Sequence, residues 1–266
     1  MKTEFFSAFF ANLAKKIIRI WNQKAFPFDE NPAMHVSTLN TPVPGAEQDF
    51  GYRCVITPEL NDSYRQRIQE KEQQAEREGK DIKFVMVGDS ITHYWEDIGK
   101  QIMNAHFTKY HPLNLGFAGD YTQNILFVIK NTSIFSRIDP KLVTLLIGVN
   151  NLGGHQSNVK GTAEGIRHCL LAIREKAPNA TILLFGIFPV GHKPDAPARA
   201  LIAATNEIIK GFADNKTVFY EDIGPKFLTP AGVLEREIMI DFLHPTDKGY
   251  KIWAKAIKPY VKKYCK

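Results

Sequence analysis

The chain has few cysteines, and none of them lies in a CxxC pair. Its 266 residues contain three, Cys54, Cys169 and Cys265. An odd number of widely spaced cysteines argues against a disulfide framework and against a cysteine-rich zinc site. This usage favours a reducing compartment, so the sequence predicts a cytoplasmic protein, with membrane association and export as the alternatives.

Long apolar runs are also missing. No stretch approaches the roughly 20 apolar residues that a membrane-spanning helix needs, which argues against an integral membrane protein. The hydrophobic content of 44% and the charged content of 23% are ordinary for a globular chain. This length suits one substantial domain, with two small domains as the alternative.

Three catalytic motifs are absent from the sequence. There is no GxSxG, no glycine-rich loop ending in Gly-Lys-Ser/Thr, and no HExxH. These absences disfavour an α/β-hydrolase, a P-loop enzyme and a zinc hydrolase, respectively.

The positive charge gathers at the two ends of the chain. The formal net charge is +6, and residues 248–266 carry lysines but no acidic residue. A basic tail can attract nucleic acid or an anionic membrane surface. No basic stripe with interleaved aromatic residues accompanies these lysines, so we expect no nucleic-acid partner. Lysines near the end of a helix also suit its dipole.

Residues 1–80 are predicted to form an N-terminal extension. Residues 5–21 show the pattern of an amphipathic helix. This helix either packs on the domain or makes a peripheral membrane contact, and a secretory signal is the weakest alternative. Residues 25–58 form a proline-rich lead-in, and residues 59–79 form a polar helix that ends at Gly79.

From residue 82 onward, short apolar runs alternate with helical patterns. The expected strands are residues 82–88, 112–117, 141–148, 181–188 and 217–222. The clearest helices between and after them cover 158–177, 197–214 and 247–264. Continuous apolar strands separated by helices predict an α/β fold, flavodoxin-like, with three α/β/α layers and about five parallel strands. We therefore assign residues 81–266 to one domain.

Reactive groups follow three of these strands. Ser90 follows the first strand at Gly88-Asp89-Ser90, Gly119 follows the second, and Asn150 follows the third. Taken singly, each is explained as well by a turn or a helix cap. In a parallel sheet, however, ligands bind beyond the carboxyl ends of the strands. A hydroxyl nucleophile, a free backbone N–H and an amide donor would therefore meet at one edge.

A fourth group lies near the C-terminus, at Asp241-Phe242-Leu243-His244. Three-residue spacing in a turn can bring carboxylate and imidazole to the same side. Asp241 can then hold one ring nitrogen of His244, leaving the other to accept the Ser90 proton. The four groups together form a complete acyl-transfer site. Four unrelated coincidences would be needed to produce the same set by chance.

These motifs make residues 82–262 resemble the SGNH (GDSL-like) hydrolase family, whose four blocks supply Ser, Gly, Asn and His. The stretches NLGFAGDYTQN and IGVNNLGG resemble the branch that contains the platelet-activating-factor acetylhydrolase catalytic subunits and bacterial carbohydrate acetylesterases. Asn151 departs from the Asp that many members carry, although this branch often has Asn. We assign residues 81–266 to the hydrolase domain. The resemblance implies ester hydrolysis through an acyl-enzyme, without a metal ion or another cofactor.

The expected catalytic residues are Ser90, Asp241 and His244, with an oxyanion hole formed by Ser90, Gly119 and Asn150. Ile91, Val149 and Leu243 adjoin them and are bulky enough to narrow an acyl pocket, although ordinary core packing explains them equally well. We therefore expect the substrate to be a short-chain ester of a carbohydrate or lipid, with acetyl as the first choice. A non-catalytic carbohydrate- or partner-binding module is the alternative function, and a homodimer is one of the oligomeric states left open.

Overall fold

The computed structural model describes residues 37–154 and 157–266. The predicted helix over residues 5–21 and its membrane contact lie outside the described residues. Among these residues, five parallel strands form one sheet in the order β2-β1-β3-β4-β5. This order is that of the flavodoxin-like fold, which confirms the predicted fold class. The strands are β1 Phe84–Gly88, β2 Pro112–Gly116, β3 Leu142–Leu146, β4 Thr181–Phe185 and β5 Val218–Glu221.

Helices connect the strands and cover the sheet. The α-helices are α2 Tyr52–Ile56, α3 Arg65–Glu78, α4 Ser90–His93, α5 Lys100–His106, α6 Thr122–Asn131, α7 Ile134–Arg137, α8 Val149–Gly153, α9 Val159–Lys176, α10 Pro197–Lys210 and α11 Asp247–Tyr264. Short 3₁₀ helices lie at Ala46–Gln48, Asp62–Tyr64, Gly79–Asp81, Tyr94–Glu96, Thr108–Tyr110 and Gly224–Phe227.

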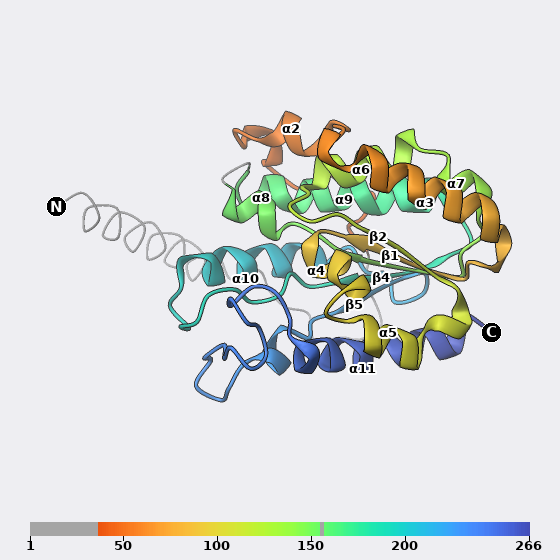
Figure 1. The fold of residues 1–266 in the computed structure, drawn as a ribbon. Helices are drawn as coiled ribbons and strands as arrows, with labels where there is room; N and C mark the ends of the chain where they lie inside the picture. Colours follow the sequence, from red (N-terminus) through yellow and green to blue (C-terminus); the bar gives the residue numbers. More distant parts are fainter. Residues whose placement is uncertain (1–36, 155–156) are drawn as a thin grey trace.

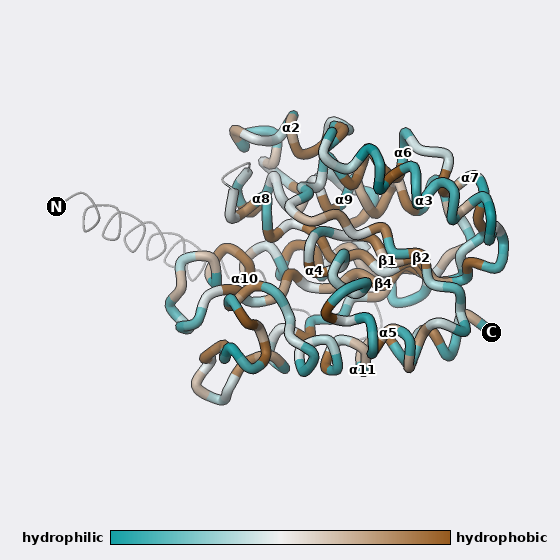
Figure 2. The backbone as a smooth tube through the Cα atoms, in the orientation of Figure 1, coloured by the Kyte–Doolittle hydropathy of each residue, from teal (hydrophilic) through white to brown (hydrophobic). Residues whose placement is uncertain are grey.

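The molecule has three layers. Figure 1 shows α3, α6 and α9 on one face of the sheet and α5 and α11 on the other. Helix α9 packs against α6 and α10, and α11 packs against α5. Every residue of β1, β3 and β4 is buried, as expected of a parallel sheet covered on both faces. Figure 2 shows the hydrophobic colour concentrated in these strands and the hydrophilic colour along the outer helix α3.

Residues 37–80 pack on the rest of the domain. Leu39, Val43 and Val55 are buried, and α2 packs against α9. The carboxylate of Glu164 accepts a hydrogen bond from the Val43 N–H at 2.8 Å and pairs with the Arg167 guanidinium at 2.7 Å. This part of the extension therefore shares the hydrophobic core, while the division of the chain at residue 80 stays a prediction.

No helix among the described residues is long and apolar enough to cross a membrane. The parallel strands have their carboxyl ends at one edge of the sheet. Ser90, Gly119 and Asn150 lie there, just after β1, β2 and β3.

Candidate active site

Ser90 lies where β1 passes into α4. The Asp89 side chain caps this helix by accepting the Ile91 N–H at 3.0 Å. Residue 88, the last residue of β1, must be glycine, because a Cβ on Gly88 would lie 2.2 Å from the Leu146 carbonyl oxygen of β3. The close packing of neighbouring strands therefore fixes where the Ser90 hydroxyl begins.

Gly119 and Asn150 follow the two strands that flank β1. Gly119 occupies the third position of a turn closed by the Asp120 N–H on the Phe117 carbonyl, and its φ of 80° is left-handed. Within the described part of the chain no hydrogen bond uses the Gly119 N–H, and open space lies where a Cβ would stand. The Asn150 amide donates to the Asp120 carbonyl at 2.8 Å. One of its two amide hydrogens is thus placed beside the Gly119 turn, and the second is available to a ligand.

Asp241 and His244 come together in a tight turn. One carboxylate oxygen of Asp241 accepts the main-chain N–H groups of Leu243 and His244, at 3.1 and 2.7 Å. The other lies 2.6 Å from His244 Nδ1. Phe242 between them has a left-handed φ of 64°. This unusual conformation turns the chain so that one side chain reaches both backbone and ring.

His244 also reaches the serine. Its Nε2 lies 2.9 Å from the Ser90 Oγ. A carboxylate can only accept, so Nδ1 donates to Asp241 and Nε2 is left to accept the Ser90 hydroxyl proton. The structure thus joins Ser90, His244 and Asp241 in one hydrogen-bonded series, across 154 residues of sequence.

Two contacts outside this series hold its members in register. The Tyr250 hydroxyl, in the second turn of α11, donates to the Ile91 carbonyl at 2.8 Å. This bond ties the helix that follows His244 to the helix that carries Ser90. The Tyr94 ring centroid lies 5.2 Å from that of the His244 ring and limits its movement. Neither tyrosine was singled out from the sequence, where no local pattern relates them to the site.

The Asp241 carboxylate stays charged although it is partly covered. Its side chain is 50% exposed and that of His244 is 21% exposed. Burial alone would raise the pKa of Asp241, but hydrogen bonds from the His244 N–H and ring outweigh this effect and lower the pKa below its ordinary value. A charged carboxylate suits a group that stabilises an imidazolium.

Two other carboxyl groups near the site have the opposite tendency. Burial, reinforced by Asp120 and opposed by the Ile91 N–H, raises the pKa of Asp89 to about 7. Burial, opposed by a hydrogen bond from Asn61, raises the pKa of Asp120 to about 7 as well. The Oδ2 atom of Asp89 is buried without a hydrogen-bond partner within the described part of the chain. No pattern in the sequence marks these two carboxyl groups as groups with a raised pKa.

Asn151 serves the fold. It is fully buried, its side-chain oxygen accepts the Thr122 N–H at 3.1 Å, and its amide donates to the Thr122 hydroxyl at 3.1 Å. It therefore links α8 to the start of α6.

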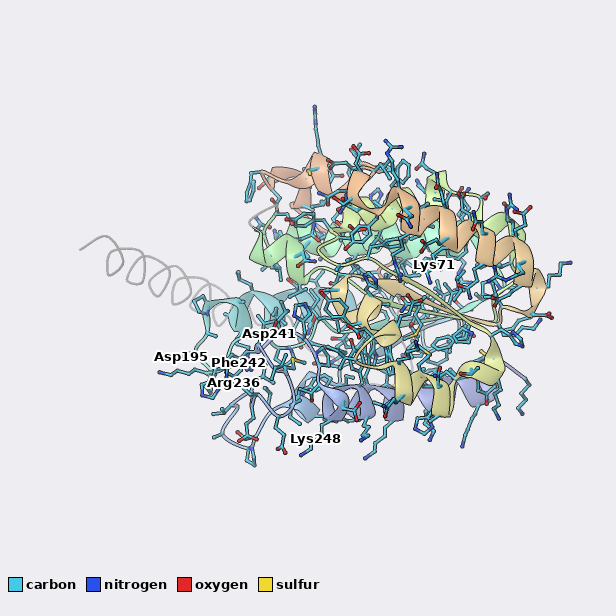
Figure 3. The ribbon with its side chains drawn as sticks, viewed as in Figure 1. Lys71, Asp195, Arg236, Asp241, Phe242 and Lys248 are labelled. Carbon is cyan, nitrogen blue, oxygen red and sulfur yellow. The ribbon has the colours of Figure 1, made fainter. Side chains whose placement is uncertain are left out.

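A cavity of about 330 Å³ borders Asp241, while Ser90 and His244 are not among its lining residues. Asn150, Asp241, Val149 and Leu243 line it, so two of the three residues expected in an acyl pocket border this space. Ile91 does not line it and is 1% exposed. The rest of the wall is mostly apolar, with Leu152, Val190, Ala198, Ile202 and Phe242. Figure 3 shows Asp241 and Phe242 at the corner of the molecule where α10 lies.

Residues 86–252 match the model of the GDSL-like Lipase/Acylhydrolase family. The chain belongs to this family. Membership makes it an ester hydrolase, which confirms the resemblance drawn from the four motifs. In the described ranges 37–154 and 157–266, no group of three or more His, Cys, Asp or Glu side chains could hold a metal ion.

Relatives of this GDSL-like chain include subunits of platelet-activating factor acetylhydrolase IB. The alpha2 subunit of Homo sapiens is 32% identical over 176 residues, which cover 66% of this chain and 72% of the relative. The alpha1 subunit of Bos taurus is 29% identical over 177 residues, which cover 66% and 73%.

Solved structures share the GDSL-like fold. A GDSL-like lipase from Bacteroides thetaiotaomicron has a TM-score of 0.61 at 19% identity, covering 75% of this chain and 97% of that one. An acetyl xylan esterase has a TM-score of 0.54 at 20% identity, covering 68% and 100%.

Proposed function

We propose that this GDSL-like hydrolase cleaves esters through an acyl-enzyme formed on Ser90. The observation that carries the proposal is the hydrogen-bonded series from the Ser90 hydroxyl through His244 to Asp241, with contacts of 2.9 and 2.6 Å. Such a series activates a weak nucleophile, because the base is oriented and its charged form is stabilised by a third group.

The steps follow from the placement of these groups. His244 Nε2 takes the Ser90 proton as Oγ attacks the ester carbonyl. The N–H groups of Ser90 and Gly119 and the Asn150 amide receive the developing oxyanion, each lowering the barrier by ~3 kcal/mol. His244 then passes the proton to the departing alcohol and activates water against the acyl-enzyme. Asp241 keeps the proton on Nδ1 and stabilises the imidazolium that forms each time Nε2 accepts a proton.

The acyl group of the proposed substrate is short, with acetyl as the first choice. Val149 and Leu243 border the cavity beside Asn150. Bulky side chains beside a nucleophile leave little room for a long acyl chain in line with the oxyanion donors. The names of two similar proteins, an acetylhydrolase and an acetyl xylan esterase, support the same choice.

The alcohol is proposed to belong to an acetylated lipid or carbohydrate. The wall formed by Leu152, Val190 and Ile202 offers few hydrogen-bond partners to sugar hydroxyls. Burying those hydroxyls without partners would cost binding free energy. The cavity therefore favours an alcohol with an apolar portion, and the lipid over the sugar.

Deacetylation of a panel of acetylated sugars and lipids, together with p-nitrophenyl acetate and octanoate, tests the proposal. We expect acetate to be cleaved faster than octanoate, and the Ser90→Ala variant to lose turnover on every substrate while keeping its fold. Removing a triad nucleophile leaves only the residual rate that substrate binding and the oxyanion donors provide.

The arms of this panel separate two claims. More than a few per cent of activity in folded Ser90→Ala would contradict the acyl-enzyme on Ser90. A preference for octanoate in the unmodified chain would reject the short acyl group and leave the serine mechanism standing.

A further inference from the structure

The turn that carries the acid of the triad is strained and little protected by burial. Phe242 adopts a left-handed φ of 64°, a conformation that bulky side chains rarely take. The neighbouring Asp241 side chain is half exposed, so surrounding side chains do not fix its rotamer. Its two short contacts to His244 depend on the path of the backbone between residues 240 and 244. Contacts from residues outside Ser90, Asp241 and His244 therefore help to hold the backbone between residues 240 and 244.

Arg236 contacts the residues on both sides of Asp241. Its Nη1 donates to the Ile240 carbonyl at 2.8 Å, and its guanidinium carbon lies 4.5 Å from the centroid of the Phe242 ring. The first contact is a charge-assisted hydrogen bond and the second a cation–π contact. Figure 3 shows Arg236, Phe242 and Asp241 gathered at one corner of the molecule.

Main-chain hydrogen bonds also hold the turn, among them that from the Phe242 N–H to the Met239 carbonyl at 3.0 Å. The Gly191 N–H donates to the Phe242 carbonyl at 2.9 Å, and the Ile240 N–H donates to the His244 carbonyl at 3.2 Å. These two bonds fix the ends of the turn. The His192 ring, 4.9 Å away, is a further contact of the Phe242 ring. Arg236 adds to these bonds a side chain that contacts both neighbours of Asp241.

We propose that Arg236 is a positioning residue for the Asp241–His244 pair, an inference that rests on the proposed serine mechanism. It holds residues 240 and 242 so that the Asp241 carboxylate faces both the N–H and the Nδ1 of His244. It touches neither Ser90 nor the ester. Its planar fork can donate to a carbonyl while its face lies on a ring, which a lysine ammonium cannot reproduce in full.

Steady-state kinetics of Arg236→Gln and Arg236→Lys test this role. We expect Arg236→Gln to lower kcat about tenfold with KM nearly unchanged, because a misplaced base slows chemistry more than binding. Arg236→Lys should recover part of the loss, since it keeps the charge over the Phe242 ring. Arg65→Gln is the matched control, because Arg65 is exposed and pairs with Asp62. It should leave kcat unchanged.

Two readouts show whether Arg236 acts through Asp241. The proton between His244 Nδ1 and Asp241 should give a strongly deshielded NMR resonance that weakens in Arg236→Gln. In an Asp241→Asn background, Arg236→Gln should cause little further loss, because both changes break the same contact.

The outcomes separate this inference from the proposed function. Wild-type kcat in Arg236→Gln, an unchanged resonance, or losses that multiply in the double variant would each overturn the role of Arg236. Full activity in Asp241→Asn would instead contradict the proposed triad itself. Circular dichroism of each variant establishes whether it is folded. If Arg236→Gln is not folded, the same measurements are made on Arg236→Lys.

Discussion

At the scale of single residues, Asn150 and Asn151 have different tasks although they are adjacent. The Asn150 amide donates to the Asp120 carbonyl, and Asn150 lines the cavity that borders Asp241. Asn151 is fully buried and holds Thr122 through two hydrogen bonds. One change of side chain should therefore affect catalysis and the other folding.

Alanine at each position should separate the two tasks. Asn150→Ala should lower kcat by about 10²–10³, because one oxyanion donor is lost. Asn151→Ala should lower the free energy of unfolding by about 1–3 kcal/mol, because the buried Thr122 N–H loses its acceptor. Urea unfolding and steady-state kinetics of both variants provide the measurements. A similar kcat loss in a fully stable Asn151→Ala would contradict this division.

Most reactive residues could be predicted from the sequence, whereas the residues that hold them could not. Ser90 follows the end of β1, and Asp241 and His244 share a short spacing, so each part of the site has a sequence pattern of its own. The left-handed Phe242 and its contact with Arg236 have no local signature. Phenylalanine does not indicate a positive φ, and the partner of its ring is set by a loop that only the folded chain defines.

At the scale of elements, the carboxyl group that caps the start of α4 is buried in an environment that disfavours its charged form. Asp89 caps the helix, yet it is fully buried and burial raises its pKa to about 7. The folded chain thus holds this proton more tightly than the unfolded chain, where the ordinary value is 3.8. Stability is therefore expected to fall as the pH rises from about 4 through about 7.

The Asp89→Asn variant should remove this part of the pH dependence. Asparagine keeps the oxygen that accepts the Ile91 N–H and cannot ionise. The variant should be more stable than the unmodified chain above pH 7, with the difference shrinking toward pH 5. Urea unfolding between pH 5 and 8.5 measures it. If the free energies of unfolding of the two proteins changed with pH in the same way, Asp89 would not be the source of this pH dependence.

The ends of elements were less well predicted than their existence. The apolar run 181–188 predicts a strand, but β4 ends at Phe185, and Ile187 and Phe188 are buried outside the sheet. The helical pattern 197–214 likewise continues past Lys210, where α10 ends. Phe212 is buried without being helical. Hydrophobic patterning reports burial, and burial does not stop where a hydrogen-bonded element stops.

At the scale of the whole molecule, the described part of the N-terminal extension is joined to the domain by buried charges. Asp49 accepts the N–H groups of Asn158 and Gly161, each at 2.9 Å, at the start of α9. Glu164 accepts the Val43 N–H, and Arg167 donates to the Leu39 carbonyl. These contacts span more than 100 residues. The sequence of the extension predicts the polar helix, observed as α3, but neither the helix α2 within the proline-rich lead-in nor its packing on α9.

The order of the strands brings Ser90, Gly119 and Asn150 to one edge of the sheet, and the loop before α11 brings the His244 ring to the Ser90 hydroxyl. A serine-directed fluorophosphonate probe, with the labelled residue located by mass spectrometry, tests this arrangement most directly. The account predicts one label per chain, on Ser90, and loss of labelling in His244→Ala, because the hydroxyl is reactive only beside its base. A folded chain that hydrolyses esters while Ser90 stays unlabelled would contradict it.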